Sequence, residues 1–174
     1  MQRASFRRAT AALFLGICAP LTVGMTGVDS DLEQRLLQTH NIERASLRIA
    51  PLKWNADLAL GAKEWAEHLS QTGRFEHSPD EPGPQIGENI WAGTSGRYAP
   101  ERMVGLWLDE KRYFKPGVFP ENSTSGDPRD VAHYTQVVWR RSTDVGCYVA
   151  RGTREDILVC RYLSAGNVRG VSPL

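Results

Sequence analysis

Two cysteines near the C-terminal end of the chain, Cys147 and Cys160, constrain its fold more than any other feature. The apolar residues around them predict two strands, over residues 145–149 and 157–163. The polar stretch between the strands contains a glycine, which is typical of a turn, so we expect a hairpin. If the hairpin is symmetric about residues 153–154, Cys147 lies directly opposite Cys160, at a cross-strand separation that a disulfide can span.

The first residues have the layout of a signal peptide. Arg3, Arg7 and Arg8 precede an uncharged apolar run over residues 11–25, and the paired arginines also permit a twin-arginine export route. The run is about 15 residues long and contains a proline, whereas a membrane-spanning helix needs about 20 apolar residues. We therefore predict a leader over residues 1–27 and no transmembrane anchor once it is removed.

The mature chain, residues 28–174, would then be secreted or periplasmic, where disulfides persist. The third cysteine of the chain lies in the leader, so an even number remains, which favours a disulfide over two buried free thiols. Removal of the leader takes away three of the 21 basic residues and none of the 20 acidic ones, which leaves a net charge of about −2. Without a basic stripe, such a chain does not match nucleic-acid binding, because phosphate neutralisation dominates that affinity.

About 147 residues are enough for one domain with one hydrophobic core, and three helices are predicted before the hairpin. The first helix starts with a capping box, Ser30 and Glu33, and stops near Pro51. The second follows Asn55 as its N-cap and ends near Gly73. We see no internal repeat and no second domain.

The third helix is predicted to begin at Pro100 and to present an apolar side that continues to Phe114. Between the second and third helices, residues 79–96 are rich in proline and glycine, and we expect no long regular element there. A similar loop spans residues 115–129. Long ordered loops in a compact domain are more often functional than idle.

Two carboxylates fall in apolar surroundings. Glu110 lies on the same helical side as Trp107 and Phe114, so its carboxylate is expected to face inward. A buried carboxylate needs a cationic or hydrogen-bond donor partner, or a wet cleft; the alternative is a partly exposed glutamate at the edge of the apolar side. Glu88 has a similar setting between two isoleucines.

Two histidines have comparable neighbours: His133 precedes a Val-Val-Trp segment, and His77 follows shortly after Phe75. His40, on the first helix, is better explained as a hydrogen-bonded core histidine. Local spacing provides no metal or nucleophile motif, since the chain has no HExxH, CxxC or G-x-S-x-G sequence. The residues alone predict a small exported α+β domain and leave its function open.

The segment His-Tyr-Thr-Gln-Val-Val-Trp at residues 133–139 resembles the signature of the CAP superfamily, which comprises cysteine-rich secretory proteins, antigen 5 and plant pathogenesis-related class 1. Plant pathogenesis-related class 1 and similar bacterial proteins are the nearest in character. Ala132 departs from the family's usual glycine, and one disulfide replaces the three of plant relatives. Further similar segments, in the family's order, are residues 40–44, 52–55, 75–78, 87–90, 107–110, 145–148 and 159–162.

The resemblance implies a three-layer α-β-α sandwich with a mixed, mainly antiparallel sheet and a large cleft on one side. The family's cleft tetrad corresponds here to His77, Glu88, Glu110 and His133. In the family the histidine pair can hold a divalent ion, and imidazole with carboxylate suits zinc better than magnesium. Our hypothesis is that His77 and His133 are metal ligands, while Glu88 and Glu110 orient the imidazoles or hold a bound water.

Two classes of function follow from the resemblance. The first is a non-enzymatic binding module for a small apolar ligand, such as a sterol or lipid, or for an extracellular or envelope protein. The alternative is a metal-dependent hydrolase, a protease or esterase, in which Glu88 or Glu110 acts as general base toward a metal-bound water. We favour the binding module, because no nucleophile or substrate pocket can be identified in the sequence.

Overall fold

A computed structural model describes residues 26–79 and 82–174 of the chain. The leader predicted over residues 1–27 lies, apart from its last two residues, outside the described residues and stays a prediction. Along the chain the elements are α1 (Thr26–Ser46), β1 (Lys53–Trp54), α2 (Ala56–Thr72), β2 (Ile86–Thr94), α3 (Pro100–Leu108), two 3₁₀ helices (Asp109–Tyr113 and Pro128–Asp130), α4 (Ala132–Val137), β3 (Asp144–Arg151) and β4 (Glu155–Leu163).

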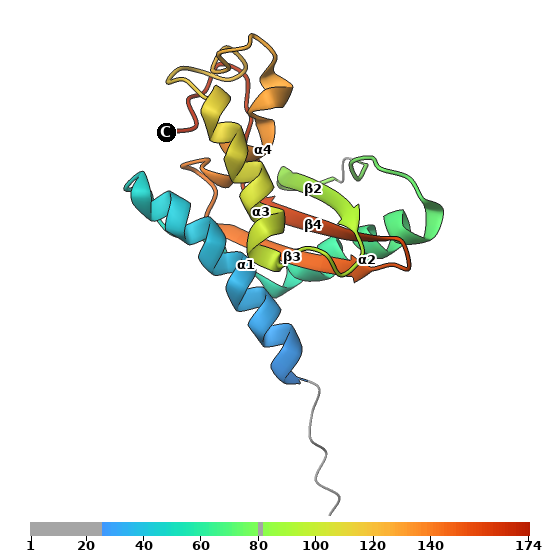
Figure 1. Ribbon diagram of the computed structural model, residues 1–174. Coiled ribbons are helices and arrows are strands. Elements are labelled where there is room, and N and C mark those ends of the chain that lie inside the picture. Colours follow the sequence, from blue (N-terminus) through green and yellow to red (C-terminus); the bar gives the residue numbers. More distant parts are fainter. Residues whose placement is uncertain (1–25, 80–81) are drawn as a thin grey trace, which may run out of the picture.

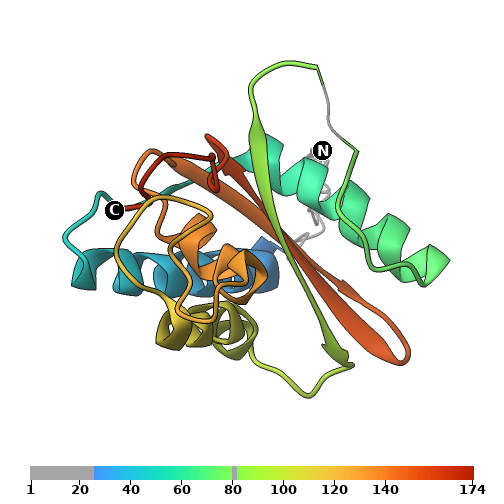
Figure 2. The ribbon, with the colours of Figure 1, turned by 90° about the horizontal axis from the view of Figure 1, so that it is seen from above.

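The four strands form one sheet in the order β1-β3-β4-β2. β1 runs parallel to β3, and the other two pairings are antiparallel. Helix α2 covers one face of the sheet, and α1, α3 and α4 lie on the opposite face (Figures 1 and 2). The architecture is thus the three-layer α-β-α sandwich with a mixed, mainly antiparallel sheet that the sequence resemblance implied.

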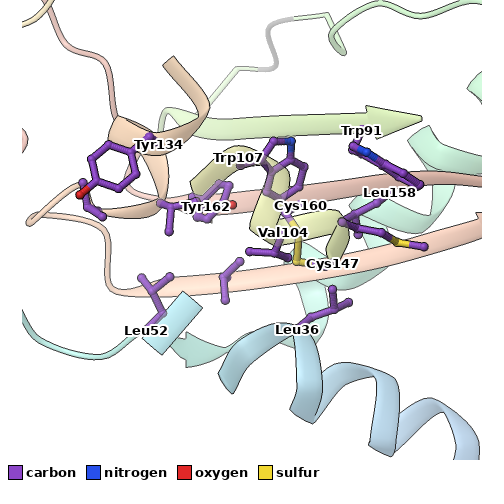
Figure 3. Close-up of a cluster of buried hydrophobic side chains, with 14 of the residues drawn as sticks. Leu36, Leu52, Trp91, Val104, Trp107, Tyr134, Cys147, Leu158, Cys160 and Tyr162 are labelled. Atoms are coloured by element: carbon purple, nitrogen blue, oxygen red, sulfur yellow. A yellow bond between two sulfur atoms is a disulfide. The ribbon is translucent and has the colours of Figure 1, made fainter. Parts of the chain in front are cut away.

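The alternation of side chains along β4 builds a core on each face of the sheet. Leu158, Cys160 and Tyr162 point toward α1, α3 and α4, where they join the larger core (Figure 3). Ile157 and Val159 point the other way and pack with the buried side of α2. One strand therefore fixes the position of both helical layers.

β3 and β4 form the predicted hairpin, and their register places Cys147 opposite Cys160. The two residues form a disulfide, as predicted, and both are buried in the larger core. The crosslink joins residues 13 apart in sequence.

Loss of this disulfide is expected to lower the free energy of unfolding by about 3 kcal/mol, because a closed loop of this length restricts the unfolded chain. Replacement of both cysteines by alanine, followed by urea unfolding, measures the effect. Reductant should shift the unfolding midpoint of the wild-type protein and leave that of the double variant unchanged. Equal midpoints for the two proteins without reductant would contradict this expectation.

Helix α2 begins and ends where the sequence predicts. The side chain of Asn55 accepts hydrogen bonds from the backbone N–H groups of Asp57 and Leu58. Gly73 follows the last turn with a φ of 68°, the left-handed conformation that ends many helices. These local signals are enough to predict both ends of the helix from the sequence.

The first and third helices differ from the prediction. α1 starts at Thr26, so Ser30 lies within the helix rather than at its cap. α3 ends at Leu108, and the chain continues to Tyr113 as a 3₁₀ helix. Helices commonly tighten in this way at their ends, and the change puts Glu110 on the 3₁₀ segment.

The prediction of no long regular element in residues 79–96 was wrong, because β2 is a nine-residue strand. Its glycines mark close packing rather than a break. A Cβ atom at Gly87 would lie 2.2 Å from Oε1 of Gln136, so only glycine lets β2 approach α4 this closely. β2 pairs with β4 alone and forms one edge of the sheet.

Candidate functional site

His77 and Glu88 form the first of two histidine–glutamate pairs. His77 lies in the loop after α2, and Glu88 lies on β2. Nδ1 of His77 is 2.8 Å from Oε1 of Glu88, and the backbone N–H of Ser78 donates to the same oxygen at 3.0 Å. The Glu88 side chain is 7% exposed and that of His77 is 64% exposed, so a buried carboxylate holds a solvent-accessible ring.

The charges of this pair stabilise each other. Burial alone would raise the pKa of Glu88, but the hydrogen bonds from His77 and Ser78 outweigh it and hold that pKa below its usual value. The same hydrogen bond to Glu88 raises the pKa of His77, although desolvation opposes the shift. The pair is therefore arranged to keep a carboxylate on Nδ1 of the imidazole.

Glu110 and His133 form the second pair. Oε1 of Glu110 is 2.6 Å from Nδ1 of His133, which lies in the first turn of α4. Oε2 accepts from the backbone N–H groups of His133 and Tyr134, each at 3.0 Å. The carboxylate that the sequence predicts to face inward thus has three donors, two of which are N–H groups that a helix start leaves without partners.

The ring of His133 is also fixed from its face. The indole of Trp107 stacks on it, with ring centroids 6.1 Å apart and an interplanar angle of 11°. In both pairs the carboxylate engages Nδ1, which leaves Nε2 as the nitrogen that can bind a ligand.

The two pairs meet at the edge strand β2. Glu88 holds His77, and the next residue, Asn89, donates from Nδ2 to the backbone oxygen of His133 at 3.1 Å. Successive side chains of a strand point to opposite faces, so each pair reaches β2 from its own side. His77 and His133 are thus linked through two consecutive residues of one strand.

A cavity of about 550 Å³ lies beside the first pair, and His77, Glu88 and Arg161 are among the residues that line it. His133 and Glu110 do not line this cavity. In the described part of the chain no three of the four residues offer donor atoms within 4.8 Å of one another. The four side chains therefore form no group of three or more close donor atoms, and each glutamate lies against its own histidine.

His40 has the core role that the sequence predicts. It is fully buried; Nδ1 is 2.8 Å from the backbone oxygen of Leu36, and Nε2 is 2.8 Å from the hydroxyl of Tyr162. Burial lowers the pKa of His40 to about 4, so the ring is neutral at physiological pH.

Sequence reasoning missed one charged residue of the site, Arg161. It lies directly opposite Glu88 in the β2–β4 register, and its Nε is 3.5 Å from Oε2 of Glu88. A correct assignment of β2 would have suggested this pairing, because opposite charges are favoured across neighbouring strands.

Residues 37–162 match the sequence pattern of CAP, the cysteine-rich secretory protein family. This chain belongs to the CAP family. The CAP protein is 34% identical to pathogenesis-related protein 1A of Nicotiana tabacum over 142 residues, which are 81% of this chain and 80% of that one. It is 31% identical to pathogenesis-related protein PRMS of Zea mays over 173 residues, 98% of each chain.

Solved structures show the same fold. The crystal structure of NaASP2 with Zn²⁺ is similar with a TM-score of 0.69 and 26% identity, covering 80% of this CAP protein and 83% of that chain. The structure of BmVAL-1 also has a TM-score of 0.69, with 23% identity over 92% of this chain and 86% of that one. The second similarity concerns the fold alone.

Proposed function

We propose that this CAP protein is a binding module outside the cytoplasm, in which His77 and His133 hold one divalent cation beside a site for a small apolar ligand. The observation that carries the proposal is the use of Nδ1 by a carboxylate in both histidines. A carboxylate on the far ring nitrogen fixes the tautomer and raises the basicity of Nε2, as in many zinc proteins.

Zinc suits these residues better than magnesium. Imidazole nitrogen is a common zinc ligand, whereas magnesium prefers oxygen ligands. His77 and His133 would bind the ion, and Glu88 and Glu110 would orient the two rings. The similar NaASP2 structure, which contains Zn²⁺, supports the choice of this ion. Bound zinc would supply a Lewis acid at these residues.

The cavity beside His77 supports a small ligand. Its volume is within the range of small-molecule sites, and its lining combines apolar residues such as Ile86 and Pro84 with polar anchors such as Gln85. The predicted leader, the disulfide and the family's description as secretory support a location outside the cytoplasm. Among the helices of the described residues, none is both long and apolar enough to cross a bilayer.

Titration of the protein with zinc tests the metal site. We expect one ion per chain, and replacement of either His77 or His133 by alanine should lower the affinity by about 100-fold or more, because two imidazoles provide the protein's ligands. His68→Ala is the control, since His68 is an exposed histidine on α2 whose ring stacks on Trp65 and not on either glutamate. Unchanged affinity in His133→Ala, or equal losses in all three variants, would contradict the proposal.

The geometry favours binding over hydrolysis. Glu110 already accepts three hydrogen bonds. Oε1 of Glu88 accepts two, and its Oε2 is buried, so neither carboxylate is poised as a general base toward water. A fluorescent fatty acid and a labelled sterol, titrated beside a screen of peptide and ester hydrolysis, separate the two functions. We expect saturable binding without turnover. Turnover that is lost with chelator and in Glu110→Gln would instead establish the hydrolase.

A further inference from the structure

We infer that Arg161 is a positioning residue for the His77–Glu88 pair. Gly61 of α2, which has no side chain, leaves the space that the Arg161 guanidinium occupies. The inference rests on the proposed cation site, since the purpose of positioning the pair is to aim His77 at the ion. The contacts of Glu88, Arg161 and Gly61 support it, and these contacts do not depend on a bound ion.

The first observation is the register of the sheet edge. Glu88 on β2 and Arg161 on β4 are direct cross-strand partners, so their side chains leave the sheet on the same face, toward α2. Their side chains are 7% and 13% exposed, and Nε of Arg161 is 3.5 Å from Oε2 of Glu88. A buried carboxylate and a largely buried guanidinium thus face each other beside the cavity that His77 lines.

The second observation is the unequal use of the two Glu88 oxygens. Oε1 accepts from His77 and from Ser78, whereas Oε2 is buried and accepts no hydrogen bond from the described residues. A buried charged oxygen is costly unless a cation compensates it, and Arg161 supplies that charge. Without it, Glu88 is expected to rotate toward cavity water or to take up a proton. Either change would release Nδ1 of His77.

The third observation is a glycine inside α2. A Cβ atom at Gly61 would lie 2.6 Å from Nη1 and 3.4 Å from Cζ of Arg161, so the guanidinium packs directly on the helix backbone. Glycine in a helix interior lowers helix stability by about 1 kcal/mol relative to alanine, so its presence there calls for a packing reason. Here the close approach of Arg161 is that reason.

A substitution at Gly61 can therefore displace Arg161 without changing Arg161 or Glu88 themselves. In Gly61→Ala the new methyl group should push the guanidinium away from Glu88. Gly105→Ala is the matched control: Gly105 lies in α3, and a Cβ atom there would meet nothing closer than 3.9 Å. Both changes improve helix propensity, so a difference between them reports on Arg161.

Two readouts are measured for Arg161→Met, Arg161→Lys, Gly61→Ala and Gly105→Ala. The first is zinc affinity by titration. The second is the His77 tautomer in the metal-free protein, from long-range ¹H–¹⁵N NMR spectra at alkaline pH, where the ring is neutral. In the wild-type protein the proton should sit on Nδ1, toward Glu88.

We expect Arg161→Met to lower zinc affinity about tenfold and to shift the tautomer toward the mixture of free histidine, because residues behind the ligands orient them in metal sites. Arg161→Lys should retain part of both properties. Gly61→Ala should have the same effects as Arg161→Met. A protein that carries both substitutions should show no further loss of zinc affinity, because both changes remove the same contact. Gly105→Ala should behave as wild type.

Three results would overturn the inference. One is an Arg161→Met protein with both readouts unchanged, and another is a Gly61→Ala protein that matches Gly105→Ala. The third is tighter zinc binding in Arg161→Met, which would mean that Arg161 acts by repulsion and not by position. If the wild-type protein binds no zinc, the proposed function fails, while the tautomer of the metal-free variants still decides the role of Arg161. Should Arg161→Met not fold, Gly61→Ala gives the same decision.

Discussion

Replacement of Arg44 by methionine is expected to lower the free energy of unfolding by about 4 kcal/mol, the largest effect of any single change considered for this protein. Arg44 is fully buried near the end of α1. Its guanidinium donates to the backbone oxygens of Ala50, Val137, Trp139 and Ser142, at 2.8 to 3.0 Å. Methionine fills the space but leaves these oxygens without their donor.

Burial lowers the pKa of Arg44 to about 10, so the side chain still carries its charge at neutral pH. Arg44→Lys separates the charge from the geometry, because one ammonium group cannot reach four oxygens on three segments. We expect lysine to recover less than half of the loss. Arg97→Met, at an exposed position, is the control and should change stability by less than about 0.5 kcal/mol. Urea unfolding of the three variants makes the comparison, and an Arg44→Met protein as stable as the control would refute the role of this network.

Acidification from pH 7 to pH 4 is expected to remove about 3 kcal/mol of stability through His40 alone. The folded-state pKa of His40 is about 4, against 6.5 for the ordinary side chain, because burial away from water disfavours the charged form of the ring. The unfolded chain therefore binds a proton that the folded chain does not. His40 favours the folded state fully above pH 6.5, and this contribution is lost as the pH falls toward 4.

His40→Gln isolates this effect, since glutamine can hydrogen bond to Tyr162 but does not titrate. Other groups, including the His77–Glu88 pair, contribute equally to both proteins and cancel in the comparison. Unfolding free energies of the two proteins across this pH range should converge as the pH falls, because only the wild-type protein loses the His40 contribution. Parallel curves would show that His40 does not titrate between the folded and unfolded states as its burial predicts.

The parts of the fold that the sequence predicts well are those determined by local signals. Asn55 and Gly73 mark the two ends of α2 through contacts within a few residues. The Cys147–Cys160 pairing follows from the symmetry of one hairpin. Each of these features depends on short-range geometry that the sequence pattern contains directly.

The features that the sequence missed depend on tertiary contacts. Gly87 reads as a strand breaker until Gln136, from a distant helix, is packed against it. The sequence also places Glu110 on a regular helix, whereas its hydrogen bonds to the start of α4 accompany a 3₁₀ segment. The four residues could be grouped only through the family resemblance, and their pairing came from the structure, since 11 and 23 residues separate the members of the two pairs. Arg161 belongs to none of the quoted family segments as a site residue, and only the strand register places it opposite Glu88.

The most direct test of the account is the position of zinc in crystals grown with the ion, located by anomalous scattering at the zinc absorption edge. We predict a single strong peak about 2.0–2.1 Å from Nε2 of both His77 and His133, with Glu88 and Glu110 still bonded to the opposite ring nitrogens. The peak should be absent in His133→Ala. A peak bound by His77 or His133 alone, by other residues, or unchanged in His133→Ala would contradict the claim that the two pairs form one cation site.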